Sequence, residues 1–211
     1  MDKDNSKTKT KTKSKIQEYI EAIIVAILIA LFLRTFIIQA FKIPSRSMVP
    51  TLLVGDHLLV NKFIYGVKIP FLRKTIIPVT NPKRGDIIVF IYPNDRSKDF
   101  IKRVIGVSGD TIEIKNKTIF LNDKEYTDTH GIYSDNVIYP GSLQPRDNFG
   151  PVTVPPEKLF VMGDNRDESA DSRYWGFVDL KDVEGKAMII YWSWDREETN
   201  VRWGRLCNLL R

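Results

Sequence analysis

A long apolar segment near the N-terminus constrains this chain more than any other feature. It runs from Tyr19 to Phe41, 23 residues, and the stretch Ala22–Leu33 within it holds apolar side chains alone. A helix needs about 20 mainly apolar residues to cross the hydrocarbon layer of a bilayer. We therefore predict a transmembrane helix over residues 18–41 in contact with the lipid bilayer, and one folded domain over residues 42–211.

The residues before this segment form a basic tail. Residues 1–15 contain six lysines against Asp2 and Asp4, so the tail carries four of the six net positive charges of the chain. Alternating lysine and threonine cannot bury apolar surface, and we predict that residues 1–17 are disordered. Positive residues beside a membrane helix stay in the cytoplasm. The pattern predicts a single-pass protein of the plasma membrane, with its N-terminus inside and its domain outside.

Two alternatives to a permanent membrane helix remain open at this point. A basic tail followed by an apolar core also fits a cleaved signal peptide, with Ile38-Gln39-Ala40 as a poor cleavage site. A buried helix of a soluble domain would leave the basic tail unexplained.

Composition excludes several classes of function. Outside the tail the charges are close to balanced, so the sequence predicts no nucleic-acid surface. The single cysteine, Cys207, excludes an intrachain disulfide and a cysteine zinc cluster. Two histidines, His57 and His130, argue against a multi-histidine metal site. We expect no metal, no cofactor and no obligate protein partner.

Short apolar runs rich in Val, Ile, Phe and Tyr follow residue 42, as is typical of strands. Gly55-Asp56, Gly85-Asp86 and Gly109-Asp110 mark turns between them. We predict a mainly β domain, with an irregular, proline-containing accessory region over residues 123–155. The predicted strands are His57–Lys62, Asp86–Tyr92, Phe100–Val107, Thr111–Ile114, Thr118–Leu121, Lys158–Met162 and Lys186–Trp192.

Ser47 is the first candidate for chemistry, because it lies six residues past Phe41. An extended chain of this length spans about 20 Å at most, which keeps the hydroxyl close to the membrane edge. A serine nucleophile needs a base. His57 lies in a strand-like run and His130 in the irregular region, so neither is a favoured base. Without a base, Ser47 would be an ordinary turn residue before Pro50.

A lysine is the alternative base. Its usual pKa of about 10.4 must fall by about three units, which requires roughly 4 kcal/mol of destabilisation of the charged form, and burial in an apolar strand can supply this. Lys102 fits, since it alternates with Phe100 and Val104. Arg103 alternates with apolar residues too, so the pattern leaves open which cation is buried. Lys62 is a weaker candidate at the end of its run.

Residues 163–173 carry a dense polar cluster, Gly163-Asp164-Asn165-Arg166-Asp167-Glu168-Ser169-Ala170-Asp171-Ser172-Arg173. Aspartates and arginines at this spacing can bond one another and hold a rigid loop. Ser169 could then orient a lysine amine. A solvated acidic loop, a carboxylate acid–base pair and a divalent metal site are the alternatives, although the arginines compete for the same carboxylates.

Four ordered motifs resemble those of bacterial type I signal peptidases (leader peptidases), a Ser-Lys class of serine peptidase. They are Ser45–Leu52, Gly55–Lys62, Arg84–Phe90 with Ile101–Arg103, and Gly163–Arg173. The resemblance covers residues 41–194 and the anchor, and implies a membrane-anchored β-rich domain. Arg46 departs from the family pattern, in which a glycine is common, and the accessory region is short.

The resemblance assigns roles to individual residues. It implies that Ser47 is the nucleophile and Lys102 the general base, while Ser45 and the Ser47 backbone N–H bind the oxyanion. Ser169 would hydrogen-bond the lysine amine, and the supporting residues would be Asp164, Asp171 and Arg173. The implied lining of shallow pockets for small side chains comprises Phe41, Ile43, Pro44, Met48, Leu52 and Ile101.

The implied function is that of a membrane-bound endopeptidase that removes signal peptides from exported preproteins after small residues, of A-x-A type, through an acyl-enzyme. A self-cleaving repressor of the Ser-Lys type is a rival, but it would carry a helical DNA-binding domain at its N-terminus. A non-catalytic anchored binding module is the other rival, and it predicts ordinary titration of Lys102.

The aromatic residues Tyr191, Trp192, Trp194 and Trp203 fit either core packing or a membrane interface.

Overall fold

The computed structural model describes residues 14–68, 75–77 and 79–210. Most of the predicted disordered tail lies outside these ranges. Its last residues do not: Ser14 caps a helix, α1, that spans Lys15–Phe36. The Gln17 backbone N–H donates to the Ser14 hydroxyl at 3.3 Å and the Ser14 N–H to the Gln17 side chain at 3.2 Å, a capping box that fixes this start.

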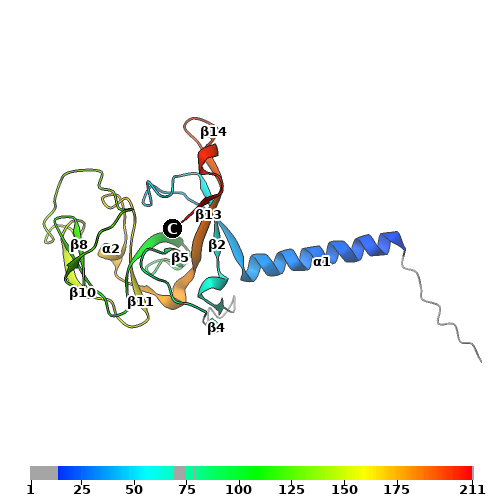
Figure 1. Cartoon of the computed structure of the whole chain (residues 1–211), viewed down its shortest axis with the longest axis horizontal. Coiled ribbons are helices and arrows are strands. Elements are labelled where there is room, and N and C mark those ends of the chain that lie inside the picture. The colour runs from blue at the N-terminus through cyan, green and yellow to red at the C-terminus, as the bar shows by residue number, and fades with distance from the viewer. Residues whose placement is uncertain (1–13, 69–74, 78, 211) are drawn as a thin grey trace, which may run out of the picture.

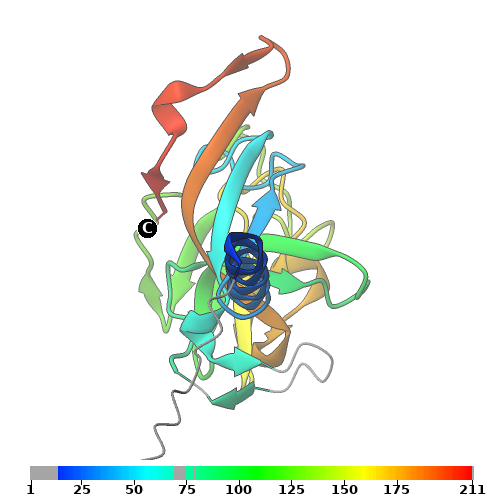
Figure 2. The same ribbon diagram turned by 90° about the vertical axis from the view of Figure 1, so that its right-hand side faces the viewer.

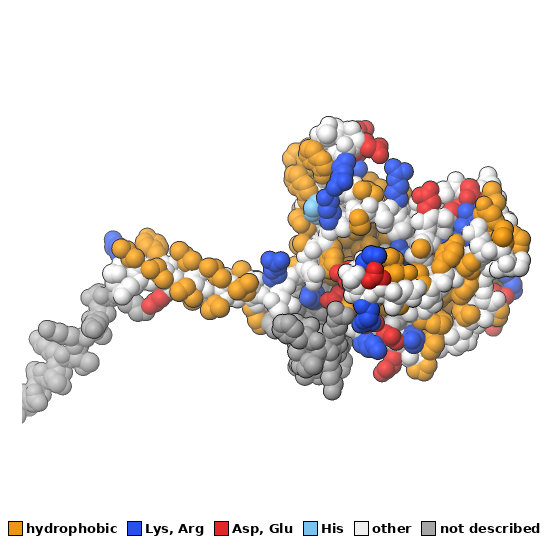
Figure 3. Space-filling model, turned by 180° about the vertical axis from the view of Figure 1, so that it is seen from behind, with side chains coloured by type: hydrophobic (Ala, Val, Ile, Leu, Met, Phe, Trp, Pro, Cys, Tyr) orange, Lys and Arg blue, Asp and Glu red, His pale blue; other side chains and the backbone are white. Residues whose placement is uncertain are grey.

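Helix α1 projects away from the rest of the molecule (Figure 1). Its mean hydropathy reaches 2.2 and none of that window is buried, so it is long and apolar enough to cross a membrane. In the space-filling view, apolar side chains cover the visible face of the helix (Figure 3). Such a surface is unfavourable in water, because burying apolar area stabilises by about 25 cal/mol per Å².

The helix is shorter than the predicted 18–41 span. It ends at Phe36, and Ile38–Lys42 forms strand β1, which pairs antiparallel with β2, Asp56–Asn61. Backbone pairing with β2 therefore replaces helical hydrogen bonding over the last apolar residues of the run. A single residue, Ile37, separates the helix from the sheet.

The main sheet has nine strands and follows the order β1-β2-β13-β5-β6-β11-β12, with β14 and β15 paired to β13. Its long strand β13 rises through the sheet and ends in a hairpin, from which the C-terminal strands return (Figure 2). The strands not yet given are β5 Ile87–Ile91, β6 Asp99–Val107, β11 Lys158–Met162, β12 Val178–Asp179, β13 Val183–Asp195, β14 Asn200–Val201 and β15 Asn208–Leu209.

A smaller, four-stranded sheet follows the order β10-β7-β8-β9. Asn116 and Lys117, and then Asn122 and Asp123, take positive φ at its two hairpin turns, as tight hairpins require. The remaining elements are β3 Val67–Lys68, β4 Thr75–Ile77, β7 Thr111–Lys115, β8 Thr118–Leu121, β9 Lys124–Glu125, β10 Phe149–Thr153, helix α2 Ser172–Trp175, and 3-10 helices η1 Phe63–Tyr65, η2 Leu180–Asp182 and η3 Trp203–Arg205.

The predicted mainly β domain is confirmed. Each predicted strand coincides with an observed strand to within a residue or two, except that Lys186–Trp192 is the middle of the longer β13. The accessory region 123–155 is less irregular than expected, because it supplies β9 and β10 to the smaller sheet.

One apolar core cluster lies directly beneath the turn that carries Ser47. It packs Met48 and Leu52, both fully buried, against Ile43 and against Leu58 and Val60 of β2. Burying side chains of this size stabilises by about 1.5–3 kcal/mol each. The turn is therefore anchored in the core by Ile43 before its serine and by Met48 and Leu52 after it.

Candidate active site

The turn after β1 holds Ser47 in a fixed position. Two hydrogen bonds close it, from the Val49 N–H to the Arg46 carbonyl at 3.1 Å and from the Leu52 N–H to the Met48 carbonyl at 2.9 Å. The Ser47 carbonyl accepts the Asn165 N–H at 3.1 Å. Ser47 is 9% exposed, so its hydroxyl has little freedom to turn toward bulk water.

Lys102 comes to this hydroxyl from the middle of β6. Its amine donates to the Ser47 hydroxyl at 2.5 Å, although the residues are 55 positions apart. Lys102 is 4% exposed. Burial lowers the pKa of this amine from 10.5 to about 8, while Asp171 and Asp164 oppose the shift and Arg173 adds to it. A sizeable fraction of the amine is therefore neutral near physiological pH, as a general base requires.

Arg103 is buried as well, which explains why the sequence pattern could not separate the two cations. Its guanidinium forms two hydrogen bonds of 2.8 Å with the Asp164 carboxylate, and Thr51 donates to the same carboxylate at 2.6 Å. A bidentate pair of this kind is stronger than a hydrogen bond between neutral groups. The contact of Lys102 is with a neutral hydroxyl instead, so its charge has no such support.

The 163–173 loop is a buried cluster and not a solvated loop. The Arg173 guanidinium donates twice to Asp171, at 2.8 Å each, and to the Arg166 carbonyl at 2.6 Å. Asp171 also accepts the Gly163 N–H at 3.1 Å. Burial raises the pKa of Asp171, but the charge of Arg173 and its hydrogen bonds outweigh this, and the net pKa is lowered. Asp171 stays ionised beside the lysine.

The accessory region braces this loop. The Arg146 carbonyl accepts a hydrogen bond from Arg173 at 2.6 Å, and the Asp135 backbone N–H donates to the Asp167 carboxylate at 3.0 Å. The Arg166 N–H donates to the Ile132 carbonyl at 2.9 Å. These contacts give residues 123–155 a structural role that the sequence alone did not reveal.

Gly163 has a role that sequence reasoning missed. A Cβ atom at this position would lie 2.3 Å from the Ser47 carbonyl oxygen and 2.3 Å from the Ser169 hydroxyl. Only glycine lets the loop approach the nucleophile turn this closely. Its place directly after the buried strand β11 was the available signal.

The two further serines differ from one another. The Ser45 hydroxyl lies 3.5 Å from the Ser47 hydroxyl, on the exposed side of the turn, where an oxyanion donor could stand. Ser169 is 4% exposed, and its hydroxyl helps to lower the pKa of the Asp171 carboxyl. Within the described part of the chain this hydroxyl forms no hydrogen bond to the Lys102 amine, so the expected contact stays a prediction.

The six expected pocket residues fall into two groups. Ile43, Met48 and Leu52 are buried in the core and form a floor. Phe41 and Ile101 are partly buried and pack on this floor, and Pro44 is exposed. Only the second group presents surface to a substrate in this conformation.

Neither histidine contacts the serine in the described structure. The ring of His57 lies against Tyr191, and the His130 ring bonds the Thr129 hydroxyl. Across residues 14–68, 75–77 and 79–210, no three His, Cys, Asp or Glu side chains are grouped to hold a metal ion.

A serine hydroxyl bound to a buried, readily deprotonated lysine is the arrangement of a Ser-Lys hydrolase. The family model described as "Signal peptidase, peptidase S26" matches residues 16–192. The chain belongs to this family of serine endopeptidases, which remove signal peptides. The resemblance drawn from the four motifs is confirmed.

Several relatives carry the same description. Signal peptidase I of Pseudomonas aeruginosa is 37% identical over 190 residues, which cover 76% of this chain and 67% of the relative. Signal peptidase I of Aquifex aeolicus is 37% identical over 211 residues, covering 76% and 78%. A crystal structure of a signal peptidase I from Enterococcus faecalis V583 is 32% identical, with a TM-score of 0.41, and covers 51% of this chain and 97% of that one.

Proposed function

We propose that helix α1 anchors this chain in the plasma membrane with its N-terminus in the cytoplasm, and that Ser47 and Lys102 cleave signal peptides from preproteins on the outer side. The observation that carries the proposal is the 2.5 Å contact between the lysine amine and the serine hydroxyl, in a site that lowers the pKa of that amine. The exposed, apolar α1 and the basic tail before it support the anchor and its orientation.

The chemistry follows from this contact. The neutral Lys102 amine takes the proton of Ser47 as its oxygen attacks the scissile carbonyl carbon. The Ser47 N–H and the Ser45 hydroxyl bind the oxyanion that forms. The lysine ammonium then gives its proton to the departing amine of the mature protein, which leaves the signal peptide as an ester on Ser47. Lys102 next removes a proton from a water molecule, which hydrolyses this ester and restores the serine.

An open strand edge beside the site suits an extended substrate. β11 pairs with β6 only over Arg103–Val107, and the ladder stops before Ile101 and Lys102. A peptide laid along this edge would add one strand to the sheet through backbone hydrogen bonds. Its alternate side chains would face Phe41 and Ile101, which leave room for small groups such as alanine. This supports cleavage after small residues of A-x-A type.

The aromatic C-terminal segment supports contact with the membrane. Trp192, Trp194 and Trp203 are 38%, 37% and 72% exposed, on β13 and in the segment that returns from its hairpin. Tryptophan rings favour the depth of the lipid headgroups. Only one residue separates α1 from β1. The face of the sheet that carries these tryptophans would therefore also lie near the bilayer.

The full-length protein in detergent, incubated with a purified preprotein, tests the proposal. The expected result is one cut after an A-x-A segment, read by sequencing the new N-terminus, and no cut with Ser47→Ala or Lys102→Ala. Cleavage by either variant would overturn the assignment of the pair. Far-ultraviolet circular dichroism of both variants shows whether the β domain is intact.

A further inference from the structure

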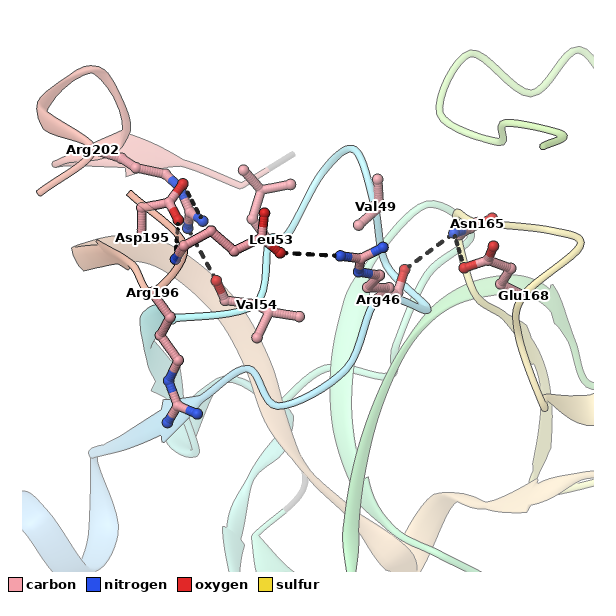
Figure 4. Close-up of a pocket in the computed structure, with 10 residues that line it drawn as sticks. Arg46, Val49, Leu53, Val54, Asn165, Glu168, Asp195, Arg196 and Arg202 are labelled. Atoms are coloured by element: carbon pink, nitrogen blue, oxygen red, sulfur yellow. Dashed lines mark hydrogen bonds and ion pairs between the residues drawn. The ribbon is translucent and has the colours of Figure 1, made fainter. Parts of the chain in front are cut away.

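A cavity of about 380 Å³ lies beside the nucleophile turn, and Figure 4 shows the residues around it. The turn has two sides. Met48 and Leu52 point into the core, whereas Val49 and Leu53, their neighbours in sequence, line the cavity. The other walls come from the 163–173 loop and from the hairpin after β13.

The cavity shares its wall with the backbone that carries the nucleophile. Asn165 donates its backbone N–H to the Ser47 carbonyl at 3.1 Å and its side-chain amide to the Arg46 carbonyl at 3.4 Å. Phe41 and Ile101, which would hold the signal peptide, do not line the cavity. A peptide that crosses Ser47 from their side therefore continues toward this cavity with the residues that follow the cut.

Two polar groups of the cavity are available to a ligand. The side-chain amide oxygen of Asn165 (Oδ1) is buried, and among the described residues it has no hydrogen-bond partner. Within the described ranges the Arg46 guanidinium has a single partner, Glu197, at 3.4 Å, and the two side chains are 71% and 84% exposed. An exposed pair of this kind is weak and exchanges readily. Arg202, by contrast, is held by Asp195 at 2.9 Å and by the Val54 carbonyl at 3.0 Å.

We propose that this cavity receives the first three residues of the mature protein, and that Arg46 selects substrates with an acidic side chain among them. The substrate carboxylate would replace Glu197 on the guanidinium, and the side-chain amide oxygen of Asn165 would accept a backbone N–H of the same segment. The proposal rests on the proposed function, and it gives a reason for an arginine at the position where the family commonly has glycine.

The test compares preproteins that differ in one residue after the cut. Each of the first three mature positions carries Glu, Gln or Lys in turn, and kcat/KM is measured with the full-length protein in detergent. We expect Glu to be preferred over Gln by about two- to fivefold at one of these positions, the size of an exposed ion pair. The preference should shrink as salt is raised, because screening weakens such pairs.

Variants of the chain assign the preference to Arg46. Arg46→Gly should remove it, Arg46→Glu should transfer it to Lys substrates, and Glu197→Gln should strengthen it by removing the internal competitor. Lys115→Gln removes an exposed cation in the smaller sheet and should leave it unchanged. A ratio of two substrates does not depend on the fraction of folded enzyme, so partial misfolding cannot mimic the result.

The possible failures are distinct. If the wild-type protein cleaves none of the preproteins, the proposed function fails and this inference fails with it. If it cleaves Glu and Gln substrates equally at all three positions, or if Arg46→Gly keeps the preference, only the role of Arg46 is overturned.

Discussion

Lys102 and Ser47 form a hydrogen bond of 2.5 Å across 55 positions of sequence, and the lysine reaches it without a carboxylate partner of the kind that Arg103 has. The sheet brings the two residues together, since β6 crosses beneath the turn that follows β1. Burial is the largest cause of the lowered pKa of the amine, about 8, and the charge of Arg173 adds to it.

The pH dependence of cleavage should report the lysine. Because the neutral amine is the active form and its pKa is about 8, kcat/KM should fall about tenfold per pH unit below 8 and level off above it. A pH series on one preprotein measures this. A flat profile between pH 6 and 9, or an inflection near that of a free lysine, would contradict Lys102 as the base.

The same burial should cost stability. The folded-state pKa of Lys102 lies below its unfolded value of 10.5, so the unfolded chain binds more protons between pH 8 and 10.5, and stability should rise with pH over that window. Below pH 8 the charged amine costs about 3 kcal/mol, from 1.36 kcal/mol per pKa unit. We expect Lys102→Met to be inactive but more stable than wild type at pH 7, as measured by denaturant unfolding. A less stable variant would show that the charge is better accommodated than its burial indicates.

Gly163→Ala should impair the nucleophile. The added Cβ would lie 2.3 Å from the Ser47 carbonyl oxygen, so the turn or the loop must shift, which would disturb the contact between Ser47 and Lys102. A displacement of about 1 Å typically costs roughly a hundredfold in rate. Steady-state kinetics measure the loss, and Gly204→Ala is the matched control, because a Cβ there meets nothing within 4 Å. Equal activity of the two variants would rule out close approach as the reason for this glycine.

Asp164→Asn should destabilise the domain by about 3–5 kcal/mol, since it removes the carboxylate that pairs with the buried Arg103 guanidinium. Asp164 also raises the pKa of Lys102, so the acid limb of the activity profile should move to lower pH in this variant. Thermal unfolding and a pH series provide the two readouts. Lys98→Gln, which breaks a pair at the surface, is the control and should change neither.

Ser45→Ala should lower kcat by about ten- to a thousandfold with little change in KM, because an oxyanion donor acts mainly in the transition state. The Ser45 hydroxyl is on the exposed side of the turn, so its removal should not affect folding. A drop in affinity at unchanged kcat would instead assign Ser45 to ground-state binding.

The β-rich fold could be predicted from the sequence because its strands are short, apolar and bounded by Gly-Asp turns. Strand β1 could not be predicted, because Ile38, Ala40 and Phe41 continue the apolar run of the helix. They form a strand only because they pair with β2. The sequence pattern also could not show which of Lys102 and Arg103 is buried, because both faces of β6 are covered and both side chains are buried.

The close contacts of the site depend on segments far apart in sequence. Asn165 and Gly163 meet the backbone of Ser47 more than a hundred residues away, and nothing local to either motif encodes that approach. The family resemblance indicated Ser169 as a partner of the lysine, whereas among the described residues its hydroxyl acts on the Asp171 carboxyl and forms no hydrogen bond to Lys102. A motif specifies which side chains gather, but not which of them touch before the substrate arrives.

The junction between α1 and β1 is a single residue, Ile37, whose N–H still bonds back to the Leu33 carbonyl. A connection of one residue gives the helix and the sheet little freedom to move relative to one another. With the helix held in a bilayer, this short connection would fix the height of Ser47 above the lipid. Scissile bonds that emerge at that height would be cut, and those buried deeper or carried farther out would pass untouched.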